Sequence, residues 1–260
     1  PASTVWISVT AASTVQLRFW YRYGPVIGRL RALFADGHSE QTAEWRFEQR
    51  SGWTEAVASQ AVPANARAIA LEFGFSHSES TAVGLTISSS GNTIRGLQIV
   101  GFPGAGLTLF DVANHNVLGG DRRIGRGPLG QGNLISRNGN RGIILGGVSF
   151  NTIVGNYLGT DPTGTLAWGN RWEGIIMGRA SHNQVIGNVI SGNSACGGGG
   201  ITMATDSSDN TVSGNHIGTD ASGTVALGNH GYGIGLHHGP SHNTIGPDNV
   251  IAYNEGDGIW

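Results

Sequence analysis

The chain has 260 residues and a formal net charge of −2, so it allows one or two domains and offers no basic excess for neutralising nucleic-acid phosphates. All fifteen cationic side chains are Arg, which excludes mechanisms that need a Schiff-base lysine or a P-loop lysine. The single cysteine, Cys196, excludes an intrachain disulfide, and no apolar run has the length of a membrane-spanning helix.

The first part of the chain, residues 1–80, has the period-two alternation of half-buried antiparallel strands. In VQLRFWYRY, Leu17, Phe19, Tyr21 and Tyr23 fall on one face, and Trp20 falls on the other. RLRALF, AEWRF and RAIALEF alternate in the same way, and the turn residues between them predict about six strands in a β-sandwich.

Three segments of this part, LRFWYRY, SGWTE and VPANARAIALEFGF, resemble a jelly-roll carbohydrate-binding module. The first strands of such a module are missing from this sequence. The resemblance implies a sugar-binding ancestry, with Trp20 as the candidate platform for a sugar ring.

The second part, residues 84–260, repeats three landmarks at spacings of 22 to 36 residues. They are Gly before an aliphatic residue, Asn before a β-branched pair, and Gly-Asn. Each repeat holds about three short strands that cannot be stable alone, so we expect them to stack in a right-handed parallel β-helix of about six rungs and about 30 Å. Gly and Asn are expected at the left-handed corners, and Asn in register is expected to form a ladder of amides.

Residues 158–170, LGTDPTGTLAWGN, return almost unchanged at 217–229 as IGTDASGTVALGN. Asp at the first position and Gly at the fourth are typical of a type I turn. The phrase is therefore interpreted as a loop that recurs because the coil recurs. Since Gly258, Ile259 and Trp260 open another coil, we expect the β-helix to be truncated here and the sequence to be an excerpt of a longer protein.

The runs NTIVGNYLGTDPTGT, GNLISRNGNRGI and NTVSGNHIGTDASGTVALGN resemble the right-handed parallel β-helix repeat proteins of bacterial cell surfaces and secretomes. That resemblance implies a secreted or surface location and a pectate-lyase-like fold. It leaves activity open, because polysaccharide lyases, hydrolases and epimerases share the architecture with members that have no assigned chemistry.

Candidate catalytic residues are Asp161 and Asp220, two rungs apart, and Arg123. The two Asp residues lie near the upper limit of carboxylate separation in inverting glycosidases, but they occupy nearly identical environments, which favours turn capping. Asp206 and Asp209 are the calcium candidates, although nothing nearby completes an oxygen shell, so we expect no cofactor. The histidines towards the end of the chain have no zinc-ligand spacing.

The candidate carbohydrate-binding residues are the loop cations Arg122 and Arg126 and the aromatic residues Trp20, Trp168, Trp172 and Tyr232. Arg grips carboxylates in bidentate geometry, and flat rings cover the apolar faces of sugars. The leading hypothesis is a non-catalytic, secreted or surface-displayed protein that binds a polysaccharide or cell-surface glycan, or acts in adhesion. The alternatives are a polysaccharide-degrading enzyme and a structural spacer.

Overall fold

The computed structural model describes the backbone of six strands within residues 3–75, and it describes residues 82–125, 129–193 and 199–260 completely. The chain divides into two compact units, Pro1–Glu79 and Ser80–Trp260. Every regular element in the described residues is a strand. In this part of the chain, no helix is long and apolar enough to cross a membrane.

The first unit contains six antiparallel strands in two sheets, the number expected from the alternation. The four-stranded sheet has the order β1-β6-β3-β4, and β2 pairs with β5. The strands are β1 (Ser3–Ser8), β2 (Thr14–Tyr21), β3 (Val26–Leu33), β4 (Ser39–Phe47), β5 (Thr54–Ala61) and β6 (Ala68–Phe75). Trp20 belongs to β2, opposite Glu55 of β5.

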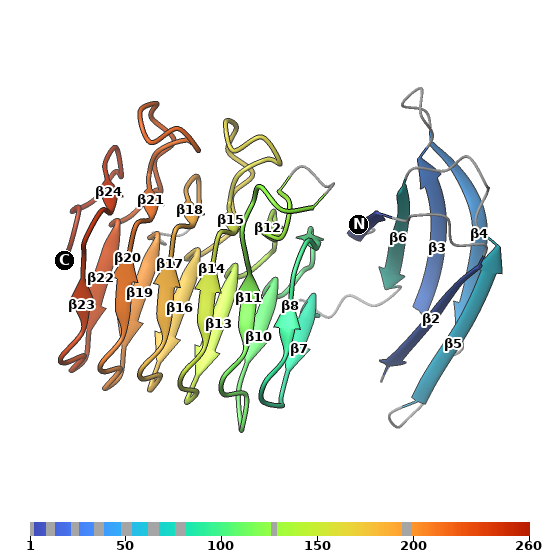
Figure 1. The fold of residues 1–260 in the computed structure, drawn as a ribbon, viewed down its shortest axis with the longest axis horizontal. Coiled ribbons are helices and arrows are strands. Elements are labelled where there is room, and N and C mark those ends of the chain that lie inside the picture. The colour runs from blue at the N-terminus through green and yellow to red at the C-terminus, as the bar shows by residue number, and fades with distance from the viewer. Residues whose placement is uncertain are drawn as a thin grey trace. The chain divides into compact units, whose positions relative to one another are not determined.

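The second unit is a right-handed parallel β-helix of six rungs, and each rung gives one strand to each of three parallel sheets (Figure 1). The β7–β22 sheet holds β7 (Leu85–Ile87), β10 (Leu107–Leu109), β13 (Ile143–Gly146), β16 (Ile175–Gly178), β19 (Ile201–Ala204) and β22 (Ile234–His237). The β8–β23 sheet holds β8 (Thr93–Ile94), β11 (Val117–Gly119), β14 (Thr152–Val154), β17 (Gln184–Ile186), β20 (Thr211–Ser213) and β23 (Thr244–Ile245). The β9–β24 sheet holds β9 (Gln98–Val100), β12 (Leu134–Ser136), β15 (Tyr157–Leu158), β18 (Val189–Ile190), β21 (His216–Ile217) and β24 (Val250–Ile251).

The core is one continuous column of aliphatic side chains inside the coil. In the β7–β22 sheet, Leu107, Ile143, Ile175, Ile201 and Ile234 pair in register and are fully buried. Packing requires the Gly before each of these strands, because there is no room for a side chain at the corner. A Cβ on Gly174, for example, would lie 2.5 Å from a methyl group of Ile190 in the neighbouring sheet.

Asparagine side chains form three ladders along the corners of the stack, two through the Asn landmarks of the repeat and one through other Asn residues. In each ladder, the amide Nδ2 of one Asn donates to the Oδ1 of the next, as between Asn156 and Asn188 at 3.0 Å. The predicted ladders run through Asn92, Asn116, Asn151, Asn183, Asn210 and Asn243, and through Asn133, Asn156, Asn188, Asn215 and Asn249. The unpredicted ladder runs through Asn138, Asn170, Asn193, Asn229 and Asn254.

The expectation that Asn occupies the left-handed corners was wrong. The described residues with positive φ include many Gly, but the others are residues such as His182, Phe150 and Arg179, and none is Asn. An Asn follows directly after His182, where its amide joins the ladder instead. The ladder needs the Asn side chain to point into the corner, so the strained backbone conformation falls on the residue before it.

The repeated thirteen-residue phrase forms a loop after β15 and after β21, two rungs apart, as expected. A β-turn is present in both loops, because the N–H of Gly164 donates to the carbonyl of Asp161, and that of Gly223 donates to Asp220, each at 3.0 Å. The central residues of both turns have no positive φ, as a type I turn requires. The two loops also contact each other, since the N–H of Ala221 donates to the Gly164 carbonyl at 2.9 Å. The backbone of the repeated phrase therefore has a structural role.

Candidate ligand-binding face

The outward side of the β7–β22 sheet is the surface on which the repeat breaks down. Each strand turns two aliphatic side chains inward, so the residue between them faces out. These outward positions are Thr86, Thr108, Ile144, Ile176, Thr202 and Gly235. Unlike the inward column, they share neither size nor polarity. The packing of the coil therefore does not determine which side chains stand on this face.

A second outward column on this face contains a gap. Gly146, Gly178, Ala204 and His237 lie side by side in register, and Phe110 follows β10 next to Gly146. Because two adjacent rungs have no side chain there, the surface is hollowed. A Cβ on Gly178 would meet no heavy atom within 4 Å.

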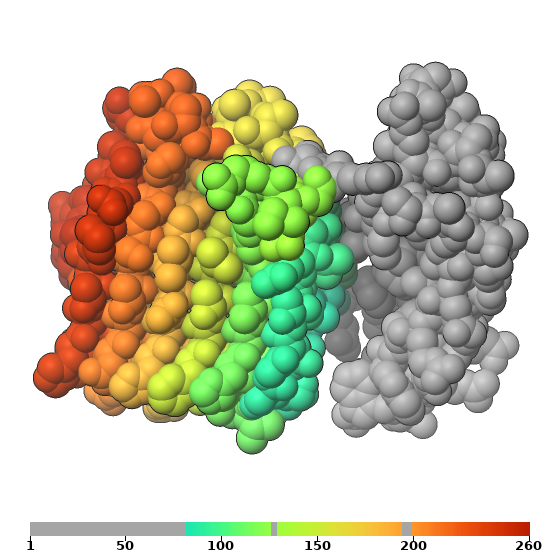
Figure 2. Space-filling model, in the orientation of Figure 1, coloured from blue at the N-terminus to red at the C-terminus, as the bar shows by residue number. Residues whose placement is uncertain are grey.

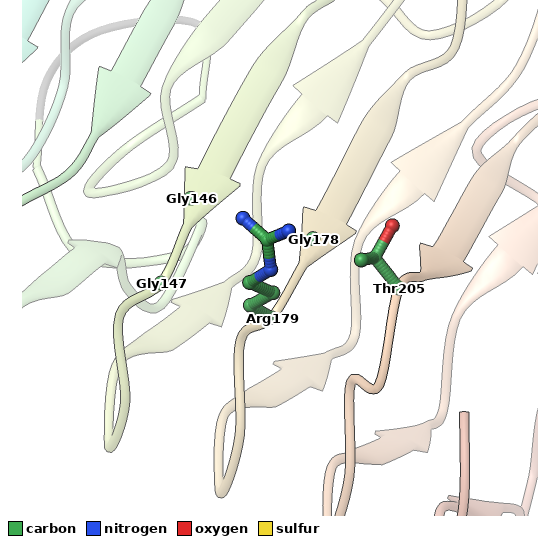
Figure 3. Close-up of a pocket in the computed structure, with 5 residues that line it drawn as sticks. All are labelled: Gly146, Gly147, Gly178, Arg179 and Thr205. Carbon is green, nitrogen blue, oxygen red and sulfur yellow. The ribbon is translucent and has the colours of Figure 1, made fainter. Parts of the chain in front are cut away.

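The resulting glycine hollow has a volume of about 330 Å³ and is lined by Gly146, Gly147, Gly178, Arg179 and Thr205 (Figure 3). In Figure 3 the Arg179 side chain rises between Gly146 and Gly178, and the Thr205 hydroxyl points the same way. The hollow is open, with a backbone floor and polar groups along one edge. It suits a ligand that lies on the surface.

A partly buried ion pair adjoins this face. The Nε of Arg141 lies 2.7 Å from Oε2 of Glu173, whose side chain is only 10 % exposed. The guanidinium of Arg141 also lies 5.8 Å from the ring centre of Trp172. Because a buried carboxylate needs a hydrogen-bonding partner, Arg141 supplies the one that Glu173 requires.

An aromatic group covers the other end of the sheet. Tyr232 shares a 2.8 Å hydrogen bond with the hydroxyl of Thr202, and the ring of His237 lies 5.1 Å from that of Tyr232 and 4.1 Å from that of Trp260. Burial raises the pKa of Tyr232, and the negative charge of Glu173 adds to this effect. The rings of Tyr232 and His237 occupy the space that a side chain on Gly235 would need.

His237 has an unusual environment in this group. Its Nε2 is buried and has no hydrogen-bond partner among the described residues. Burial lowers the pKa of His237, and the neighbouring His238 lowers it further. A neutral imidazole in an aromatic setting is the result. With Arg141, Glu173, Thr202 and Tyr232 it makes up what we call the polar cluster, a set of chemically different groups on one face.

The structure separates Trp168 and Trp172, which the sequence analysis placed in one aromatic cluster. Trp172 lies beside Arg141, next to the β7–β22 sheet, and Tyr232 lies on the same face. Trp168 packs instead against Leu134, Tyr157 and Val189 outside the β9–β24 sheet, and its ring lies 4.0 Å below the guanidinium of Arg137. The two tryptophans stand on opposite sides of the corner that Asn170 occupies.

Asp161 and Asp220 bind their own loops. Oδ1 of Asp161 accepts from the N–H groups of Thr165 and Leu166, each at 2.9 Å, and Oδ2 accepts from the hydroxyl of Thr163 at 2.6 Å. Burial works to raise the pKa of Asp161, but these hydrogen bonds together outweigh it and lower the pKa. The hydroxyl of Ser222, assisted by backbone N–H groups, likewise lowers the pKa of Asp220.

The cationic loop after β11 is partly engaged within the molecule. Arg122 donates to the carbonyl of Gly187 at 2.7 Å and lies 5.1 Å from the ring centre of Tyr157. Arg123 is highly exposed and pairs with Asp121 at 2.8 Å, which lowers the pKa of that carboxyl to about 2. Arg126 lies outside the described residues. Figure 2 shows the described part of this loop as the green protrusion beside the yellow rungs.

The remaining candidates stand apart from this face. Asp206 and Asp209 are both exposed corner residues with positive φ, and they belong to no group of three metal-ligand side chains in the described residues. Trp20 lies in the first unit, and only its backbone is described.

Sequence reasoning missed the glycine hollow, Arg179, Glu173, Thr202 and His237 as parts of one surface. The available signal was indirect. In the aligned repeats, the second residue after each landmark glycine changes from Thr to Ile to Thr to Gly, whereas its neighbours stay aliphatic. A position that varies within a strict repeat is free of the packing constraint and can serve another purpose.

The fold defines the protein as a right-handed parallel β-helix repeat protein. A protein-family model described as "NosD: Periplasmic copper-binding protein (NosD)" matches residues 159–260, which is less than half of the chain. The matched part runs from the first of the two repeated loops to Trp260. No curated protein and no solved structure matches the chain significantly.

The description of that family raises the question whether the described residues could hold copper. Imidazole and sulfur are the ligands that copper prefers. No group of three His, Cys, Asp or Glu side chains converges within residues 82–125, 129–193 and 199–260. Met177 and Met203 are fully buried in the core, and the unpaired Nε2 of His237 is covered by aromatic rings. These residues do not fit a copper site.

Proposed function

We propose that this is an exported β-helix protein that binds a polysaccharide along the outward face of the β7–β22 sheet. The observation that carries the proposal is the glycine hollow, which lies on the same face as the polar cluster and the aromatic side chains. Ligand sites combine a concave surface with aromatic side chains and a few placed polar groups, and this face has all three. Binding or adhesion without cleavage is the role we favour.

An extended ligand suits this face better than a compact one. The face continues across six rungs at a spacing of about 4.8 Å, so neighbouring positions recur along a line. A polymer of similar units can make several weak contacts along such a line, and their sum gives useful affinity. Trp172, Tyr232 and Trp260 supply flat rings beside the line, and rings of this kind pack on the apolar faces of sugars.

The proposed location rests on similarity. The family model that matches residues 159–260 describes a periplasmic protein, and the repeat phrases resemble those of secreted and surface proteins. We therefore infer export from the cytoplasm. The first unit, with Trp20 in β2, is proposed as a second sugar-binding element on the same chain.

The binding proposal is tested by filling the hollow. Gly178→Leu adds a side chain where a Cβ meets open space, so the variant is expected to fold normally and to lose polysaccharide binding. Gln184→Leu is the matched control, because it places the same side chain at an exposed position of the β8–β23 sheet. Binding to a panel of immobilised polysaccharides is measured by affinity electrophoresis. Equal binding by Gly178→Leu and Gln184→Leu would contradict the proposal.

A polysaccharide-cleaving enzyme is the second candidate, and the polar cluster is the observation that favours it. Repeating polar residues serve the coil, whereas Arg141, Glu173, Tyr232 and His237 do not repeat and share one face. Cleavage would appear as new reducing ends or unsaturated sugars from pectate or alginate. If Glu173→Gln abolishes the product, the function is catalysis at this face and not binding alone. If only Arg123→Ala abolishes it, the reaction takes place at the cationic loop.

A further inference from the structure

Arg179 differs from the other arginines that border the candidate face. Its side chain makes no ion pair and donates no hydrogen bond to any described residue, whereas Arg141 is paired with Glu173 and Arg123 with Asp121. Arg179 is also exposed, at a corner with a φ of 52°. The guanidinium therefore has no ion-pair partner in the described part of the molecule.

One acid lies near Arg179 along the corner, but the two side chains do not pair. Gly147 precedes Arg179 by one rung and Thr205 follows it by one rung, and each of these residues also has a positive φ. The nearest acid is Asp206, which directly follows Thr205, and no ion pair joins its carboxylate to Arg179 within the described residues. Oδ1 of Asp206 lies towards Gly239, one rung further along the coil. The guanidinium of Arg179 is therefore left without a partner of its own.

The hollow beside Arg179 has the room and the second donor that an anionic group needs. It is lined by the backbone of Gly146, Gly147 and Gly178 and by the side chains of Arg179 and the hydroxyl-bearing Thr205 (Figure 3). Guanidinium groups bind the two oxygens of a carboxylate or sulfate through parallel N–H bonds, and a hydroxyl can donate to a third lone pair.

We propose that the glycine hollow is a subsite for an anionic substituent, a carboxylate or a sulfate, of the bound polysaccharide, and that Arg179 is the residue that recognises the charge. This inference rests on the proposed function, because it specifies which polysaccharides the face accepts. It also locates charge recognition on the β7–β22 sheet and away from the cationic loop, where Arg122 and Arg123 already have partners.

The test uses two pairs of polymers that share a backbone and differ in their charged substituent. The carboxylate pair is polygalacturonate and its methyl-esterified form, and the sulfate pair is dextran sulfate and dextran. Binding of the full chain and of three variants is measured at low and high salt. Arg179→Gln removes the proposed contact, and Arg171→Gln removes an exposed charge that does not line the hollow. Arg123→Gln tests the cationic loop.

We expect the wild-type chain to prefer the charged member of at least one pair, and the responsive pair identifies the substituent. Arg179→Gln should weaken that binding about fivefold to tenfold, the range for losing one partly exposed charged contact, and should leave binding to the neutral member unchanged. Arg171→Gln should change the affinity less than twofold. The effect of Arg179→Gln should shrink in high salt because salt screens exposed charges.

Other results separate this inference from the proposed function. Equal binding to charged and neutral polymers, unaffected by Arg179→Gln, would overturn the anionic subsite and leave polysaccharide binding intact. A charge preference that survives Arg179→Gln and is lost in Arg123→Gln would move the subsite to the cationic loop. Binding to none of the four polymers would overturn the subsite and the proposed function together. Thermal unfolding of each variant confirms that it retains the fold.

Discussion

Replacing Asn188 with Ala removes the centre of one amide ladder and should destabilise the β-helix strongly. Oδ1 of Asn188 accepts from the backbone N–H of Asn156 at 2.8 Å and from its Nδ2 at 3.0 Å. The Nδ2 of Asn188 donates to Oδ1 of Asn215 at 3.0 Å and to the carbonyl of Ile153 at 2.9 Å. The side chain is 1 % exposed, so water does not replace these partners in the folded state.

The magnitude follows from what the substitution leaves behind. A typical intramolecular hydrogen bond contributes about 1 kcal/mol net, and a buried donor left unpaired costs about 1–3 kcal/mol. With the 3.1 Å bond from Nδ2 to the carbonyl of Ile186, five bonds are lost, and the backbone N–H of Asn156 loses its acceptor. Since all five bonds involve the one Asn188 side chain and do not add fully, we expect a loss of about 4 kcal/mol in the free energy of unfolding.

Urea denaturation of the full chain measures this loss, with Gln184→Ala as the control. Gln184 is exposed and its side chain makes no hydrogen bond to the described residues, so its truncation should change stability by less than about 0.5 kcal/mol. Asn188→Asp adds a second test. A buried carboxylate can accept but cannot donate, so its pKa would be raised and this variant should be more stable at pH 4 than at pH 7. A loss below about 1 kcal/mol for Asn188→Ala would refute the role assigned to the ladders.

Three further predictions concern the loop, one corner and the hollow. Asp161→Ala should lower the free energy of unfolding by about 2 kcal/mol, because it leaves the N–H groups of Thr165 and Leu166 without an acceptor. Urea denaturation measures this loss, and an unchanged midpoint would contradict it. Because the pKa of Asp161 is lowered in the folded state, its contribution to the free energy of unfolding is complete above the unfolded value of 3.8 and is lost as the pH falls below it. The stability of Asp161→Ala should therefore decrease less in acid than that of the wild-type chain, as measured by unfolding at a series of pH values. Gly159→Ala should abolish folding at 37 °C, seen as loss of soluble protein, since its φ is 89° and its Cβ would lie 2.3 Å from Oδ1 of Asn193. Gly178→Leu should match the wild-type thermal midpoint, and marked destabilisation would mean that the hollow is not open space.

Most of the coil could be predicted because every repeat has glycine and aliphatic residues at the positions where packing requires them. Every Gly-aliphatic landmark opens a strand of the β7–β22 sheet, and even Ile259 pairs in parallel with Ile234. The third ladder was missed because loops of different length precede its members. Asn170 and Asn229 follow the inserted loops, and Asn138 does not, so their common place becomes visible only in three dimensions.

The candidate face was harder to predict because its main feature is the absence of side chains. A glycine in the sequence is interpreted as a turn or a strand breaker, and nothing distinguishes Gly178 from the corner glycines until the neighbouring rungs are in place. The split between Trp168 and Trp172 has a similar cause. Only three residues lie between them, but one of these is the ladder residue Asn170, which turns the chain at a corner.

Side-chain footprinting by hydroxyl radicals, with and without a saturating polysaccharide, locates the surface that the ligand covers. Binding on the β7–β22 sheet predicts that oxidation decreases at Trp172, Tyr232 and Trp260, which border this sheet, and remains unchanged at Phe150 and Tyr253, which are more than half exposed elsewhere on the coil. Protection of Phe150 or Tyr253 with no protection at Trp172, Tyr232 or Trp260 would contradict it.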